Sequence, residues 1–491
     1  MSTTAPSTER VDLLFAVLAG ITGVAGSYAL AGYTRQFLVA PIDALVVRLT
    51  PGSIVAWMIE NVGEEAHVIH IGMSVAIAVG LLAGTALAGL LVADRLDRPF
   101  GGVALAGTLA WVTAATITLE PLLAFGTALP VALFTAVGAT PVSAPDHDPS
   151  RRRALVSGAS ALAFVGLSAG LGRLATGEDS QSDADTSEAV TRRLDEADEK
   201  SLEVAGDIPG LVSPFEEFYN TDIAEFDPDL SAEGWSMTIT GEVGQDTTVT
   251  FDELTEMPTE HRFVTLRCVG EDLNGHKLDN AVWTGTPIKP LLEEADPEGE
   301  CDCVMLHAED GYYVQFPVSA LENGFLAWGM NGRPLPQSHG RPVRVLIPGH
   351  WGEVNVKWLS EIELLDEETD GYWEERGWHG TGPVNTVAKI WSDTTLDSGN
   401  VEVAGHAYAG TRGVERVEVS TDGGDTWVDA ELSEPLPGED VWRQWRHEFE
   451  PDGAHEVVAR AIDGEGNRQQ EERTDSFPSG AAGWVRRTVQ A

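Results

Sequence analysis

The three cysteines of this sequence, Cys268, Cys301 and Cys303, could bind a metal, form a disulfide or remain buried thiols. An odd number at these spacings predicts no disulfide framework. Cys301 and Cys303 lie in an alternating Cys-Asp-Cys-Val-Met-Leu run, which predicts a strand with both thiols on one face. No third or fourth ligand follows at a useful spacing, so two buried small residues are favoured over a metal site. Cys268 stands alone at a predicted strand end, where a thiol is ordinarily a buried apolar group.

Four short blocks of sequence follow one another in the second half of the chain. They are Thr265–Gly270 with the Asn280–Gly285 and Pro287–Leu292 segments behind it, Leu335–Arg344, Ile347–Leu359, and Val417–Trp427. In this order and spacing they closely resemble the sulfite oxidase family of molybdenum enzymes, over residues from about 207 to 490. One block alone is a weak signal, and the series of four is a strong one.

The resemblance implies a cofactor and the residues that hold it. Cys268 becomes the metal ligand, a soft thiolate that completes a molybdenum site whose other sulfurs come from one molybdopterin. The pterin ends in a phosphate, which calls for fixed cations and backbone N–H groups. The residues that match the family's cofactor-binding positions, or allow close backbone approach, are His339, Arg344, Lys357, Gly349 and Gly352.

The segment Pro214–Asp222 resembles the family's first cofactor loop. Animal and plant sulfite oxidases carry an Arg-Asn-His run there, and this chain reads Thr221-Asp222-Ile223. Tyr219 and Asn220 are therefore weaker candidates for cofactor binding.

The substrate pocket departs from the family in its charges. After the ligand the family reads Cys-Ala-Gly-Asn-Arg-Arg, whereas this chain has Glu271 and Asp272 in the corresponding stretch. Each lost charge-assisted contact costs roughly 1.5–3 kcal/mol. The sequence thus predicts oxygen-atom transfer on a small substrate other than sulfite, such as a neutral sulfoxide, with true sulfite oxidation as the alternative.

Three other residues complete the predicted pocket. Trp378 stands in the position of the family's pocket tyrosine, and Arg486 is a candidate catalytic cation. Arg267 could also lean towards the substrate.

A non-catalytic binding module on a degenerate fold is the alternative of another class. The chain retains Cys268 together with the cofactor-binding residues, which favours the enzyme. The chain has no haem-domain or cysteine-rich cluster motif, so the electrons are expected to pass to a separate partner. His67 and His70 are three apart on one helix, which favours a satisfied pair over haem ligands.

The elements that must position these residues fall into two predicted domains. Residues 208–380 predict an α+β molybdopterin-binding domain, with strands within Gly234–Asp252 and Phe263–Cys268 and short helices at Phe251–Leu254 and Ile288–Glu294. Residues 381–491 contain short alternating strands and turns, typical of an all-β immunoglobulin-like sandwich. The family resemblance makes this second domain a dimerisation domain, so a homodimer is expected.

Five apolar stretches in residues 1–175 are each long enough to cross a hydrocarbon core of about 30 Å. They are Leu13–Tyr33, Val68–Ala93, Pro99–Leu119, Pro121–Pro145 and Ala154–Gly172. Cations flank alternate ends, from Arg10 to the Arg151–Arg153 cluster. The positive-inside rule then gives a multi-pass cell-membrane protein with its catalytic part on the extracytoplasmic side.

Two segments qualify that topology. Phe37–Ile59 contains Pro41, Asp43 and Pro51, which favours an interfacial or re-entrant segment over a sixth span. Residues 176–207 are rich in acidic and polar residues, which predicts a disordered linker.

The composition limits the partners. The chain has 77 acidic and 31 basic residues, a formal net charge of −46, and only five lysines. Such a surface repels nucleic acid and is typical of a halophile protein kept soluble in strong salt. The expected partners are a small substrate, a membrane and an electron carrier.

Overall fold

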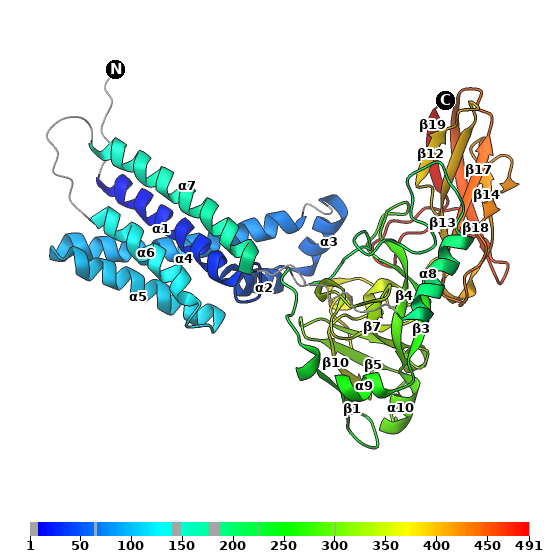
Figure 1. The fold of residues 1–491 in the computed structure, drawn as a ribbon, viewed down its shortest axis with the longest axis horizontal. Helices are drawn as coiled ribbons and strands as arrows, with labels where there is room; N and C mark the ends of the chain where they lie inside the picture. The colour runs from blue at the N-terminus through cyan, green and yellow to red at the C-terminus, as the bar shows by residue number, and fades with distance from the viewer. Residues whose placement is uncertain are drawn as a thin grey trace. The chain divides into compact units, whose positions relative to one another are not determined.

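The computed structural model describes residues 8–62, 66–139, 149–175, 187–223, 225–299 and 301–490. These residues form two compact units, each described here by itself (Figure 1). The first unit holds the N-terminal helices together with residues 225–229, and the second holds the remainder from residue 187 onwards. The predicted 208–380 domain is therefore interrupted by a short segment that packs with the helices.

The described part of the first unit is helical. Its helices are α1 (Thr8–Ala31), α2 (Val39–Leu49), α3 (Gly52–Asn61), α4 (Ala66–Leu96), α5 (Pro99–Thr118), α6 (Ala124–Ala139) and α7 (Pro149–Ala175). Small residues allow α1, α4, α5 and α6 to pack closely, because a Cβ on Gly26 would lie 2.1 Å from the Gly126 carbonyl oxygen. Within the described residues, three segments are long and apolar enough to cross a membrane: Asp12–Ala31, His67–Leu96 and Pro99–Thr118.

The fourth and fifth membrane spans stay predictions. The fourth coincides with α6, which has 16 residues and ends at Ala139, and residues 140–148 lie outside the described ranges. The fifth lies within α7. The Phe37–Ile59 segment folds as α2 and α3, of 11 and 10 residues, each too short to cross about 30 Å alone.

Polar contacts join α2 to α4, and Tyr33, which follows α1, to residues 225–229. His70 Nδ1 and Ser74 Oγ both hydrogen bond to Asp43 Oδ1, at 2.9 and 2.8 Å, so His70 is satisfied as predicted. Tyr33 donates a hydrogen bond to Glu225, and Phe226 is 6% exposed.

The prediction of a disordered linker is wrong for part of residues 176–207. Helix α8 spans Glu188–Lys200, and Ser187 caps its N-terminus by accepting from the Val190 N–H. Val190 and Ala197 are buried on one face of α8. Residues 176–186 lie outside the described ranges.

The predicted α+β domain is built on two sheets (Figure 1). One has the order β2-β1-β10-β5-β6, from Thr247–Thr250, Ser236–Gly241, Leu359–Leu364, Val304–Ala308 and Tyr313–Phe316. The other has the order β3-β4-β7-β8 with β9 beside β7, from Glu260–Arg267, Leu278–Pro287, Phe325–Met330, Arg333–Pro334 and Arg344–Leu346. Short helices α9 (Phe251–Glu256), α10 (Lys289–Ala295) and α11 (Val318–Leu321) connect them.

The C-terminal part is rich in strands, as predicted. One sheet has the order β11-β13-β17-β16 with β12 beside β13, from Val387–Ala388, Val401–Tyr408, Arg443–Phe449, Glu431–Leu432 and Ser392–Thr395. The other has the order β15-β14-β18-β19, from Val428–Asp429, Val414–Ser420, Ala454–Asp463 and Val485–Gln490. The immunoglobulin-like classification stays a prediction.

The prediction for Cys301 and Cys303 is wrong. They form a disulfide, and both precede β5 rather than lying within it. The chain bends there, which brings their Cα atoms to 5.2 Å.

Candidate functional site

Cys268 directly follows β3 and begins a loop of ten residues, 268–277, called here the Cys268 loop. Burial raises the pKa of its thiol, and the positive charge of Lys277 opposes that shift. A hydrogen bond with the Thr221 side chain also favours the thiolate. The loop near Pro214–Asp222, predicted only by a weak resemblance, therefore reaches Cys268. No contact between Thr221 and the thiol was predicted from the sequence.

The same first loop holds Lys357. The Lys357 ammonium donates to Asp222 Oδ2 at 2.9 Å, to the Ser338 carbonyl at 2.8 Å and to the Asn220 side chain. The side chain of Lys357 is 9% exposed. The structure thus brings Asn220 and Lys357 together, as the predicted cofactor site requires.

His339 and Arg344 form a buried pair beside Phe218 and Trp283. Arg344 donates to the Asn355 carbonyl at 2.8 Å, and its guanidinium lies over the Trp283 ring. Burial lowers the pKa of Arg344 to about 10. Burial and the neighbouring Lys357 and Arg344 charges lower the pKa of His339 to about 3, so its imidazole is neutral.

Two buried nitrogen atoms of this pair are unpaired within the described residues: His339 Nδ1 and Arg344 Nε. Buried polar atoms without partners are rare in proteins and call for an explanation such as a bound group. A neutral ring nitrogen and a guanidinium N–H suit the ring atoms and phosphate of a pterin cofactor. These residues therefore fit molybdopterin.

The two predicted cofactor glycines have different neighbours. A Cβ on Gly352 would lie 2.8 Å from the Tyr219 hydroxyl oxygen, so Gly352 lies against a predicted cofactor residue. Gly349 has φ +76°, and a Cβ there would lie 3.0 Å from Thr411 Oγ1 in the C-terminal domain. The close approach at Gly349 is made by the C-terminal domain, and its role in the cofactor cradle stays a prediction.

Trp378 lies beside Cys268. A Cβ on Gly270 would be 3.7 Å from the Trp378 ring and 4.0 Å from Cys268 Sγ. Trp378 is 3% exposed, and its Nε1 has no hydrogen-bond partner within the described part of the chain. An indole in this position can cover the Cys268 side chain and present an N–H donor to a small molecule.

The two cations expected in the pocket are engaged elsewhere. Arg486 lies on β19 and donates to the Gly423 carbonyl at 2.9 Å and to Glu456 at 3.2 Å, both within the C-terminal domain. Its predicted catalytic role is not supported, because these contacts join it to strand neighbours and not to the Cys268 loop. Arg267 is fully buried and bonded to Glu271 Oε1 at 2.8 Å.

Comparisons with known proteins agree with this geometry. Residues 224–373 match the oxidoreductase molybdopterin binding domain, and residues 383–484 match the Mo-co oxidoreductase dimerisation domain. Rat mitochondrial sulfite oxidase is 28% identical over 296 residues, which cover 49% of this chain and 54% of the rat protein. The uncharacterized oxidoreductase YuiH of Bacillus subtilis is 31% identical over 150 residues, 30% of this chain and 74% of YuiH.

Among solved structures, the sulfane dehydrogenase SoxCD of Paracoccus pantotrophus aligns with a TM-score of 0.48 and 18% identity, covering 64% of this chain and 94% of that one. The chain spans about half the length of the mitochondrial sulfite oxidases it matches.

The matched domains and the buried residues around Cys268 define a molybdopterin-dependent oxidoreductase. Within that class, the chain belongs to the sulfite oxidase family.

Proposed function

We propose that this protein is a membrane-anchored enzyme that transfers an oxygen atom to or from a small substrate at a molybdenum held by Cys268. The observation that carries the proposal is that the first loop, which reaches Cys268 through Thr221, also contacts Lys357 and His339, while His339 and Arg344 keep unpaired nitrogen atoms. The bound cofactor supplies the two-electron change at the metal.

The chain's own residues prepare the site. Thr221 and the Lys277 charge favour the thiolate form of Cys268. Arg344 supplies positive charge for the phosphate, neutral His339 offers a ring nitrogen, and Lys357 holds the first loop through Asn220 and Asp222. Buried Trp378 restricts water beside Cys268.

We propose a substrate less charged than sulfite. Arg267 and Arg486, the two arginines predicted to meet an anion, are held by Glu271 and Glu456. Sulfite oxidation remains the second candidate, because the Glu271 carboxylate is also held in a buried network and would not repel an anion as predicted.

The test is molybdenum analysis of the full chain, purified in detergent and high salt after expression with cofactor synthesis, followed by activity assays. We expect molybdenum near one atom per chain and turnover of a sulfoxide with an artificial electron donor. A protein without molybdenum would favour the non-catalytic binding module. Faster oxidation of sulfite than reduction of every sulfoxide tested would establish the second candidate.

We also propose that the catalytic unit faces the extracytoplasmic side and passes electrons to a separate partner. Ser398 is exposed in the C-terminal domain, so Ser398→Cys offers a label there. A membrane-impermeant maleimide should label Ser398→Cys in cells whose outer layer has been removed, in a Cys268→Ser background. Labelling only after lysis would place the catalytic unit in the cytoplasm.

A further inference from the structure

The Cys268 loop is closed at its base. The Cys268 N–H donates to the Lys277 carbonyl at 3.0 Å, and the Gly275 N–H donates to the Asp272 carbonyl at 2.8 Å. Glu271 turns inward, where its Oε2 accepts from the Lys277 N–H at 3.0 Å. The position of Cys268 is therefore tied to the conformation of the whole loop.

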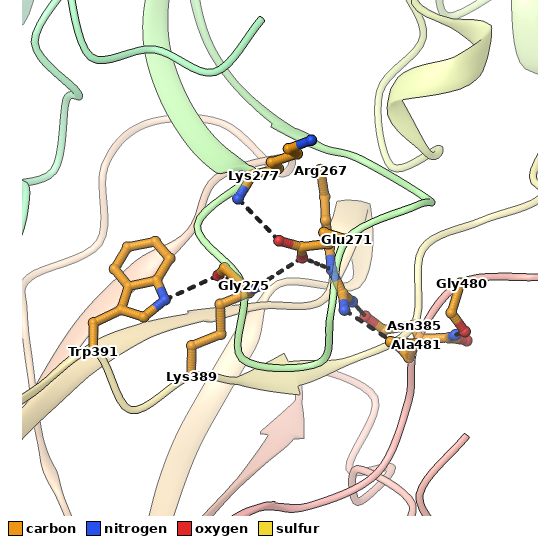
Figure 2. A network of polar contacts seen from close by, with 9 residues as sticks. All are labelled: Arg267, Glu271, Gly275, Lys277, Asn385, Lys389, Trp391, Gly480 and Ala481. Atoms are coloured by element: carbon orange, nitrogen blue, oxygen red, sulfur yellow. Dashed lines mark hydrogen bonds and ion pairs between the residues drawn. The ribbon is translucent and has the colours of Figure 1, made fainter. Parts of the chain in front are cut away.

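Three consecutive residues of the C-terminal domain, Lys389–Trp391, form hydrogen bonds with this loop. Figure 2 shows two of them, Lys389 and Trp391, beside Glu271 and Gly275. The Lys389 ammonium donates to Glu271 Oε1 at 2.6 Å and to the Gly275 carbonyl at 2.8 Å. The Trp391 indole donates to the same carbonyl at 3.1 Å. Asn274 donates to the Ile390 carbonyl at 2.8 Å and accepts from the Ile390 N–H at 2.9 Å.

Arg267 adds a second connection to the same domain (Figure 2). Its guanidinium donates to the Asn385 carbonyl at 2.8 Å and to the Ala481 carbonyl at 3.2 Å, in addition to its bond with Glu271. Arg267, which precedes Cys268, and Glu271, which follows it, thus both form hydrogen bonds with the C-terminal domain.

The network buries charge completely. The side chains of Arg267 and Lys389 are 0% exposed and that of Glu271 is 2% exposed. Removing one partner from such a group leaves an uncompensated buried charge, which is strongly unfavourable. Contacts with the C-terminal domain therefore compensate the charge buried beneath the Cys268 loop.

We propose that the C-terminal domain has a second role beyond dimerisation: its Lys389–Trp391 segment positions Cys268 and so completes the metal site. Lys389 is then a positioning residue that acts through Glu271 and Gly275. The inference rests on the proposed role of Cys268 as metal ligand.

The test measures labelling of Cys268 in the full chain in detergent. Cys301 and Cys303 are joined in a disulfide, so Cys268 is the one free cysteine of the chain's three. In cofactor-free protein, Lys389→Met should raise the rate of Cys268 labelling by a neutral maleimide about tenfold, since the loop opens more often. In molybdenum-loaded protein the paramagnetic resonance signal of the metal should broaden. Lys200→Met is the matched control, because Lys200 also reaches the C-terminal domain, at the Pro435 carbonyl, but away from the Cys268 loop.

Asn274→Ala is the second variant. It removes both hydrogen bonds with Ile390 and leaves the buried charges paired, so it should fold and raise the labelling rate by about threefold. The inference is overturned if Cys268 in Asn274→Ala is labelled no faster than in Lys200→Met. The same holds for Lys389→Met if that variant folds. Absence of molybdenum from the unaltered protein would contradict the proposed function instead, because the labelling rates need no metal.

Discussion

Two groups of buried polar residues lie around Cys268, and they differ in how their charges are compensated. In the first, Arg267, Glu271 and Lys389 bond to one another and to backbone carbonyls (Figure 2). In the second, His339 and Arg344 are also buried, but each keeps a nitrogen without a partner in the described structure. The first group lies at the joint between two domains, and the second lies where the family resemblance places the cofactor.

Between these two groups, the difference distinguishes charges that the protein itself compensates from nitrogen atoms that a ligand can complete. Burying a polar group costs free energy unless a hydrogen bond replaces its water. Where the protein supplies that bond, the group stabilises the fold; where it does not, a bound group can supply it. The predictions below test this division.

The largest effect is expected at the thiol that both groups surround. Cys268→Ser replaces a soft ligand by a hard oxygen and should reduce turnover by at least about a hundredfold. The side chains are nearly the same size, so the thermal midpoint of the cofactor-free protein should be unchanged. A variant that retains more than a tenth of the activity, at equal molybdenum content, would show that Cys268 is not the ligand.

Within the binding group, His339→Leu should lower cofactor retention about 10–100-fold, as the loss of a residue supporting a metal site commonly does. The apolar side chain leaves no unpaired nitrogen, so the stability of the cofactor-free protein should change by only about 1 kcal/mol. His339→Asn keeps a polar atom close to the Nδ1 position and should retain more cofactor. Molybdenum per chain and the unfolding midpoint measure the two effects, and a large loss of stability without loss of molybdenum would move His339 into the structural group.

Local patterns predicted the elements around the site well. The strand predicted to end at Cys268 is found as β3, which ends at Arg267. The acidic composition of residues 176–207 concealed α8, because only Val190 and Ala197 form its buried face. The bend that joins Cys301 to Cys303 had no local signal, since their spacing equally suits a strand.

Long-range contacts could not be predicted from the sequence. Lys389 lies 118 residues from Glu271, and no local pattern predicted that the two would meet. Arg486 was placed in the pocket by a loose motif match, whereas strand pairing holds it beside Glu456. Asn220 was a weaker candidate because its loop departs from the family motif, and the structure places its side chain against Lys357.

The smallest predicted effect concerns a buried carboxyl that has no cation beside it, in contrast to Glu271. Asp440 is 5% exposed and accepts a hydrogen bond from the Tyr408 hydroxyl, while its carbonyl accepts from the Thr265 N–H at 3.0 Å across the domain joint. Burial raises the pKa of Asp440 to about 7, and hydrogen bonds from Tyr408 and the Gly349 N–H oppose the rise only in part. Glu271 is compensated by charge, whereas Asp440 is compensated by keeping its proton.

The pH dependence of stability follows from that difference. The pKa of Asp440 is higher in the folded chain than its ordinary value of 3.8, so its contribution to stability is full below pH 3.8 and is lost as the pH rises to about 7. Asp440→Asn keeps the shape and cannot ionise, so the variant should gain about 2 kcal/mol over the unaltered protein between pH 5 and pH 8. In thermal unfolding of the full chain at constant salt, the difference in midpoint between Asp440→Asn and the unaltered protein should grow by roughly 4–8 °C from pH 5 to pH 8. A difference that does not change with pH would mean that Asp440 is ionised throughout, and that a cation compensates it as in the Glu271 network.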